Sequence, residues 1–203
     1  MTNVFISVIV FIVVIVIHEL AHGYAAYILG DPTAKQAGRL TLNPLAHLDP
    51  VGTVILPALL IMTRSPVIFG WAKPVPINPY NFADPRKGML LTSFAGPGSN
   101  FVLAAVFAAL FKTGWFPAHS IPWVFLLYGV LISLVLGLFN LIPVPPLDGA
   151  NMVASVLPAK LARQYMKVER YGFIILIGLL YLGLFDRVIL PLVTVLMRLL
   201  IGS

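Results

Sequence analysis

The sequence predicts an all-α polytopic membrane protein. We expect a three-helix core and a C-terminal helical hairpin, with a re-entrant segment and a small extended or β element between the first and second core helices. Of the 203 residues, 60% are hydrophobic and only 10% are charged, whereas a soluble domain of this size needs more polar surface. Cysteine is absent, which excludes a disulfide framework and any thiolate ligand or nucleophile.

Each core helix is predicted from an apolar run of the length that a bilayer requires, about 20 residues. These runs are residues 4–29, 89–111 and 122–142. Gly30 and Pro32 end the first run, since glycine terminates helices and proline does not continue them. The tail, residues 171–201, is apolar except for three charged residues. It could be two short helices joined by a tight turn or one long segment with a polar break, and we favour a hairpin of two short spans. The charged residues are Asp186, Arg187 and Arg198.

The region between the first two spans is too short or too rich in proline to cross the membrane. As a helix, the apolar part of residues 51–63 reaches only about 18 Å, which is less than the roughly 30 Å hydrocarbon core, so we expect a re-entrant segment. Residues 66–79 contain four prolines and are predicted to be extended, as an edge strand or hairpin.

The distribution of basic residues supports this topology. If residues 30–88 and 143–170 face the cytoplasm, ten lysines and arginines lie inside and two lie outside, as the positive-inside rule requires. Counting residues 51–63 as a full crossing would move the second basic loop outside. We therefore divide the chain into a core, residues 1–155, and a basic cytoplasmic loop with the C-terminal hairpin, residues 156–203. The charge indicates membrane orientation and no nucleic-acid partner.

The first apolar run carries His18, Glu19 and His22 at its centre. Ionisable groups are costly inside a bilayer, so such a cluster indicates a functional site. The two histidines are four residues apart and share one helix face, in the H-E-x-x-H pattern that lets two imidazoles bind one zinc ion. Glu19 is offset by one residue and suits the role of general base.

A catalytic zinc usually takes three protein ligands and leaves one position open. Among the remaining acidic and histidine residues, position along the chain leaves His47, Asp49 and Asp148 as candidates. Asp148 follows the third span and lies among three prolines and a glycine, which restrict its backbone, so we assign it as the third ligand. His47 and Asp49 are more typical of loop and cap residues.

Three motifs in this order, HELAH, FAGPGSN (94–100) and NLIPVPPLDG (140–149), closely resemble those of the site-2 proteases. These are zinc metalloproteases that cut peptide bonds inside membranes. The resemblance covers roughly residues 10–155 and is to the small bacterial-type members without a PDZ or CBS domain.

The resemblance implies one catalytic zinc held by His18, His22 and Asp148, with Glu19 as the catalytic acid/base. It also implies that Asn140 helps to bind substrate and that the motif containing Asn100 packs the central helix at the site. We therefore expect both asparagines to contribute to substrate binding, although each could instead form only an interhelical hydrogen bond.

The leading functional prediction is a zinc-dependent endopeptidase that cleaves transmembrane segments of other membrane proteins. We expect it in the inner or plasma membrane of a bacterium, with its active site toward the cytoplasm. The alternatives are a metal or ion transporter and a non-catalytic zinc-binding membrane protein. Glu19 discriminates between these classes, because a structural zinc site needs no base beside its ligands.

Overall fold

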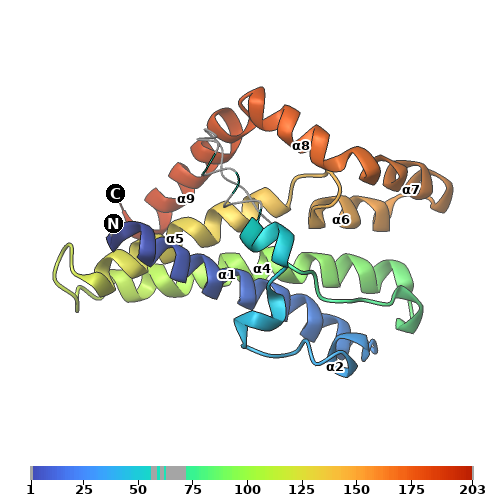
Figure 1. The fold of residues 1–203 in the computed structure, drawn as a ribbon, viewed down its shortest axis with the longest axis horizontal. Helices are drawn as coiled ribbons and strands as arrows, with labels where there is room; N and C mark the ends of the chain where they lie inside the picture. Colours follow the sequence, from blue (N-terminus) through green and yellow to red (C-terminus); the bar gives the residue numbers. More distant parts are fainter. Residues whose placement is uncertain (1, 56–58, 60–61, 63–71, 203) are drawn as a thin grey trace.

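The computed structural model describes residues 2–55, 59, 62 and 72–202, and within these ranges it is helical and contains no β-strand. Three long helices lie side by side, with both chain termini at one end of the bundle (Figure 1). The helices are α1 (Thr2–Ile28), α2 (Thr33–Gln36), η1 (Pro44–His47), η2 (Pro50–Ile55), η3 (Pro79–Asn81), α4 (Pro85–Lys112), α5 (Ile121–Asn140), α6 (Asp148–Val156), α7 (Ala159–Met166), η4 (Lys167–Tyr171), α8 (Gly172–Tyr181), η5 (Phe185–Ile189) and α9 (Leu190–Ile201).

The three predicted core helices are present as α1, α4 and α5, and each is long and apolar enough to cross a membrane. Local sequence explains where they begin. The Asp84 side chain accepts hydrogen bonds from two backbone N–H groups at the start of α4, and Ser120 does so once for α5, as N-cap residues do. Gly30 has a φ of +105° just after α1, a conformation that favours glycine at a helix end.

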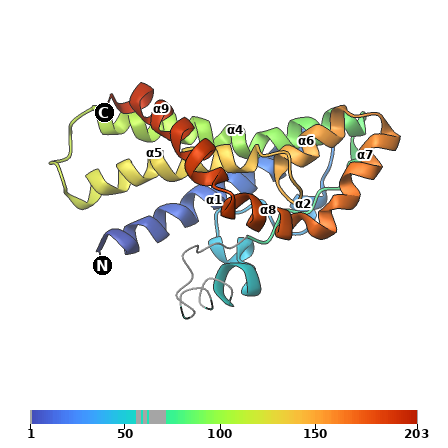
Figure 2. The same cartoon turned by 90° about the horizontal axis from the view of Figure 1, so that it is seen from above.

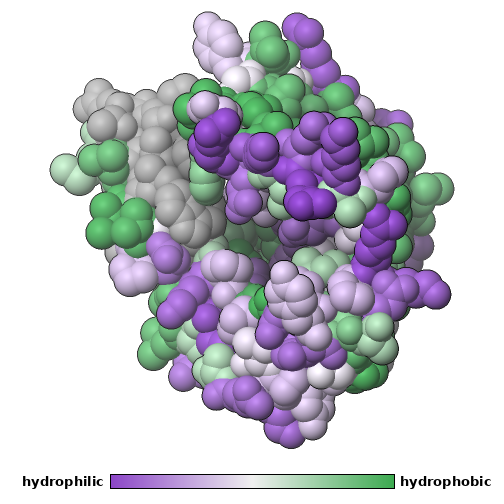
Figure 3. Space-filling view, turned by 90° about the vertical axis from the view of Figure 1, so that its right-hand side faces the viewer, coloured by the Kyte–Doolittle hydropathy of each residue, from purple (hydrophilic) through white to green (hydrophobic). Residues whose placement is uncertain are grey.

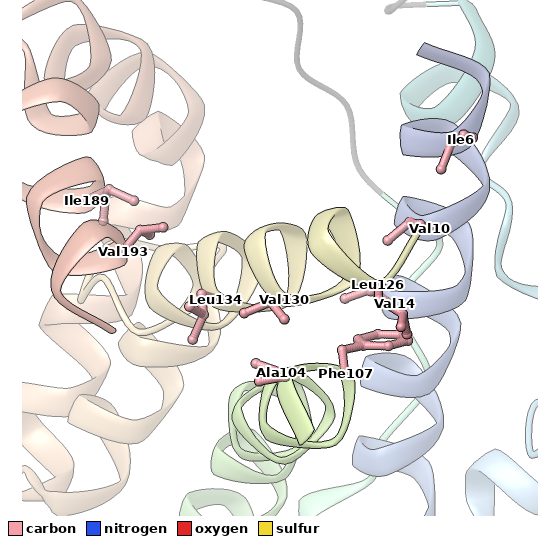
Figure 4. Packing of buried hydrophobic residues seen from close by; sticks show 11 residues of the cluster. Ile6, Val10, Val14, Ala104, Phe107, Leu126, Val130, Leu134, Ile189 and Val193 are labelled. Atoms are coloured by element: carbon pink, nitrogen blue, oxygen red, sulfur yellow. The ribbon is translucent and has the colours of Figure 1, made fainter. Parts of the chain in front are cut away.

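The hydrophobic core lies where α1, α4 and α5 meet (Figure 4). Val14 of α1, Phe107 of α4 and Leu126 of α5 point toward one another there. Gly129 allows the close approach of α4 and α5, because a Cβ at this position would lie 2.6 Å from the Phe107 ring. Small residues at such contacts let membrane helices pack without a bulky side chain between them.

The C-terminal region differs from the predicted hairpin. The stretches Ala159–Tyr181 and Phe185–Ile201 are both helical, and together they are long and apolar enough for a span, but they are bent by only 64° where they meet. Gly183 lies in the break with a φ of +87°. α9 packs against α4 and α5 (Figure 2). Ile189 at the end of η5 and Val193 of α9 join the core. This bent helix pair fits the alternative of one long segment with a polar break better than a tight hairpin.

The expected elements between the first two spans are only partly described. Of the predicted re-entrant segment 51–63, the structure describes residues 51–55, 59 and 62, the first five of which belong to the short π-helix η2. Of the predicted extended segment 66–79, the described part, 72–78, has no regular secondary structure and pairs with no strand. The three prolines in 74–79 lack the N–H groups that a ladder would need.

Candidate metal centre

Three side chains from two separate parts of the chain converge on one point. His18 Nε2 and His22 Nε2 are 3.1 Å apart, and each lies 3.2 Å from Asp148 Oδ2. Both imidazoles are buried and the carboxylate is nearly so. In the described part of the chain, these three residues form the group of histidine and acidic side chains placed to hold a metal ion.

The local fold explains why the third residue reaches the other two. Asp148 begins α6, directly after a proline-rich turn at the end of α5. Gly149 lets this turn fold back on α5, since a Cβ there would lie 2.3 Å from the Leu141 carbonyl oxygen. Tyr165 of α7 donates a 2.6 Å hydrogen bond to the Pro143 carbonyl. The turn before the carboxylate is therefore held from two sides.

Hydrogen bonds to the outer ring nitrogens orient both imidazoles. His22 Nδ1 lies 2.7 Å from the Thr92 carbonyl oxygen. A carbonyl only accepts, so Nδ1 carries the proton and, in a neutral ring, Nε2 keeps its lone pair. His18 Nδ1 lies 3.0 Å from the Asn100 side-chain nitrogen. Turning that amide over would let its oxygen accept from the His18 Nδ1–H, and amide orientation is assigned from such networks.

One orphaned atom of the cluster supports the presence of a cation. Asn100 Oδ1 and Asp148 Oδ2 are both buried without a hydrogen-bond partner, which is costly. Turning the Asn100 amide pairs its oxygen with His18 but leaves its nitrogen in the unpartnered position, so only Asp148 Oδ2 bears on the cation. Asp148 Oδ2 faces the Nε2 lone pairs of His18 and His22. These three electron-rich atoms repel one another unless a proton or a metal ion lies between them.

The spacing of the three atoms fits zinc. Tetrahedral zinc binds nitrogen and oxygen ligands at about 2.0–2.1 Å, which separates the ligand atoms by roughly 3.3 Å. The observed separations are 3.1, 3.2 and 3.2 Å. Asp148 serves as an ionised ligand at neutral pH, because an aspartate carboxyl ordinarily has a pKa of about 4 and a nearby cation favours its charged form.

Gly96 of α4 lies directly against the two imidazoles. A Cβ at this position would lie 2.2 Å from His22 Nε2 and 2.7 Å from His18 Cε1. No side chain fits there, so glycine lets α4 close one side of the metal centre. The sequence motif 94–100 was expected to pack at the site, and the structure shows that packing for Gly96 and Asn100.

Glu19 lies beside the metal centre without belonging to the cluster. It is half-buried on α1, and its Oε2 accepts a 2.9 Å hydrogen bond from the backbone N–H of Val75. This carboxylate is free of the ligand set, as the offset by one residue predicted. The Val75 donor could not be found from sequence, because it lies 56 residues away in a segment with no motif.

The structure separates the other candidate residues from the cluster. His47 is buried and bonds the Thr41 carbonyl through Nε2, while Asp49 caps the start of η2 through Val51 and Gly52. Both contacts are those of loop and cap residues. Asn140 donates to Leu136 within its own helix, and its expected contact with substrate stays a prediction. Asn100 contacts His18 rather than open space, a contact that its expected substrate-binding role did not include.

Hydrophilic side chains surround a hollow at the end of the molecule that carries α2 and α7 (Figure 3). α6, which begins with Asp148, lies toward the same end (Figure 1). The opposite end carries both termini and the apolar core. The metal centre therefore lies toward the polar end of an otherwise apolar bundle.

Comparison with known proteins gives one family. The model of peptidase family M50 matches residues 116–183, which include Asp148. The protein named "Putative zinc metalloprotease YwhC" from Bacillus subtilis (strain 168) is 41% identical over 198 residues, covering 91% of this chain and 84% of the relative.

Two more distant relatives are also zinc metalloproteases by name. "Putative zinc metalloprotease Rip2" of Mycolicibacterium smegmatis is 30% identical over 84% of this chain. The protein of the same name from Mycobacterium tuberculosis H37Rv is 28% identical over 80% of this chain. This chain spans 64% and 61% of their respective lengths. No solved structure matches the chain significantly.

Proposed function

This chain belongs to peptidase family M50, the site-2 proteases, and we propose that it cleaves peptide bonds within or near transmembrane segments of other membrane proteins. Family membership makes it a membrane-embedded zinc metallopeptidase. The main support for cleavage within transmembrane segments is the position of the ligands. His18 and His22 are buried on a 27-residue apolar helix, so peptide bonds must reach them at membrane depth.

One zinc ion would be held by His18, His22 and Asp148. When bound, zinc would polarise the carbonyl of the peptide bond and lower the pKa of bound water to about 7, which is the chemistry that peptide hydrolysis needs. The chain's own contribution is to keep both Nε2 lone pairs and an ionised carboxylate pointing at one place. Thr92 and Asn100 orient the rings, and such outer contacts tune metal affinity.

Glu19 would act as the general acid/base. Its carboxylate takes a proton from the attacking water and returns it to the leaving amine, which needs a group that is next to the metal but is not a ligand. Glu19 is next to His18 on α1 and lies outside the group of three ligands, which supports this role. The alternative of a non-catalytic zinc protein leaves this costly membrane carboxylate without a role.

The substrate would be a transmembrane helix that unwinds locally, because helical carbonyls are already hydrogen-bonded. Asn140 and the extended segment that precedes α4 would offer replacement hydrogen bonds to the unwound stretch. The ten basic residues in the loops 30–88 and 143–170 support an orientation in which the polar end, and with it the metal centre, would face the cytoplasm. The site would thus obtain water from the cytoplasm of a bacterial cell.

The decisive experiment compares Glu19→Gln with Glu169→Gln, since these are the two glutamates of the chain. Glu169 is exposed in η4 and serves as the matched control. We expect Glu19→Gln to keep its zinc and lose cleavage of a substrate helix reconstituted in liposomes, while Glu169→Gln stays active. Cleavage by Glu19→Gln at the wild-type rate would contradict the assigned mechanism. Absence of cleavage by the wild type toward any membrane-embedded peptide would contradict the function.

A further inference from the structure

We propose that the backbone N–H of Val75 is a positioning group for Glu19, and that residues 72–78, here called the strap, are built to present it. This inference deepens the proposed function, because it rests on Glu19 as the acid/base. The strap follows no motif, and its prolines predict only an extended chain. The structure gives it a specific partner on α1.

The contact itself restricts the carboxylate. Val75 N lies 2.9 Å from Glu19 Oε2, and Val75 is 6% exposed, so water has little access to compete for this hydrogen bond. A glutamate side chain has three rotatable bonds, and ordering it costs conformational entropy. A bond to one oxygen removes much of that freedom in advance and leaves Oε1 for proton exchange. Preorganisation of this kind is what a reacting group needs.

The strap is held on both sides of Val75. On one side, Lys73 donates its N–H to the His47 carbonyl at 2.9 Å, and its own carbonyl accepts from Arg39 Nη2 at 2.7 Å. On the other side, the Asn78 N–H donates to Asp31 Oδ2 at 2.7 Å. The Val75 N–H therefore lies between anchors two and three residues away.

These anchors are buried polar residues that the metal centre does not use. Asp31 is 0%, His47 1% and Arg39 8% exposed, and burying such groups is costly. Each of them contacts the strap directly, through a side chain or, for His47, through its carbonyl. Asp31 also accepts from Thr33 and Asn81, and the His47 ring bonds the Thr41 carbonyl, so the strap is tied to a wider buried polar network.

The strap's sequence presents one donor at the required place. Pro74 and Pro76 flank Val75, and proline has no N–H, so Val75 is the single donor in this stretch of three. Gly23, one turn along α1 from Glu19, lets the strap lie close to the helix. A Cβ at Gly23 would lie 3.2 Å from Val75 Cγ1 and 2.5 Å from Leu40 Cδ2.

Proline at position 75 removes the donor, and its ring Cδ takes the place of the N–H hydrogen, so Glu19 Oε2 must leave the position that it holds beside Val75. Pro76 already restricts Val75 to extended conformations, which a proline also adopts. Val75→Ala is the matched control, because it removes side-chain packing but keeps the N–H. For the zinc-loaded full chain, we expect Val75→Pro to lower kcat roughly 10- to 100-fold, with KM and zinc content unchanged. Val75→Ala should keep kcat within about twofold, even if its thermal midpoint falls.

Equal kcat values for Val75→Pro and Val75→Ala would overturn the proposal, and so would a raised kcat for Val75→Pro, which would mean that the strap obstructs Glu19. If Val75→Pro does not fold, Arg39→Gln tests the same idea through the strap's anchor. It should lower kcat without loss of zinc, and an unchanged kcat would overturn the proposal. Glu19→Gln measured in parallel separates the two questions. If it remains active, the proposed role of Glu19 fails, whatever Val75→Pro does.

Discussion

Gly96→Ala tests the packing of α4 against the metal centre. The added Cβ would lie 2.2 Å from His22 Nε2, 2.5 Å from His22 Cε1 and 2.7 Å from His18 Cε1, whereas ordinary contacts of a Cβ begin at 3.4 Å. One or both rings must therefore move by about 1 Å, or α4 must shift. Metal ligands tolerate deviations of only about 0.2 Å.

The expected consequence is loss of zinc affinity rather than loss of the fold. Disturbing outer contacts of metal ligands typically costs 10- to 100-fold in affinity, and displacement of the ligands themselves should reach at least the upper end. We therefore expect zinc affinity to fall by about 100-fold, or roughly 2.8 kcal/mol. Competition with a chelating dye in detergent solution measures this directly.

Gly98→Ala is the matched control on the same helix. Its Cβ would meet the Phe94 ring at 3.2 Å, and this ring is half-exposed and free to yield. Its zinc affinity should stay near that of the wild type. If Gly96→Ala and Gly98→Ala bound zinc equally well, the close approach of α4 to the imidazoles would have no part in forming the site.

Two asparagines and one aspartate give further expected outcomes. Asn100→Ala removes the partner of the His18 ring and should lower zinc affinity 10- to 100-fold, whereas Asn140→Ala should keep zinc and raise KM for a helical substrate; the reverse pattern would contradict both assignments. Burial raises the pKa of Asp31, but hydrogen bonds from its neighbours lower it further, so the net pKa is below its usual value. Its stabilising effect is therefore present above about pH 4 and is lost as the pH falls below that value. The stability difference between wild type and Asp31→Asn, measured by thermal unfolding, should shrink on acidification from pH 5 to pH 3, and a constant difference would refute this.

The three core helices were predictable because membrane spans are determined by local properties. Apolar length predicts the helix, but α4 begins at Pro85, after the Asp84 cap, four residues before the predicted span. The bend at Gly183 was not predictable in this way. A polar break in an apolar stretch allows both a tight turn and a shallow bend, and packing of α9 on α4 and α5 decides between them.

The candidate site was predictable to the extent that its chemistry is local. His18 and His22 share a face by helix periodicity alone. The prolines and the glycine around Asp148 restrict the backbone of its turn, and they are visible in the sequence. The partners of the site residues are not local. The Thr92 carbonyl and the Val75 N–H belong to the backbone, which has no sequence signature, and they meet α1 only through tertiary packing.

The central claim is that side chains from α1 and from the turn after α5 together hold one zinc ion. Zinc binding by purified Asp148→Ala, measured against wild type and Asp186→Ala, tests it most directly. Asp186 lies in η5, just after the C-terminal break and outside the cluster. We predict one zinc per chain for wild type and Asp186→Ala, and an affinity lower by more than about 100-fold for Asp148→Ala. Wild-type zinc binding by Asp148→Ala would contradict the account.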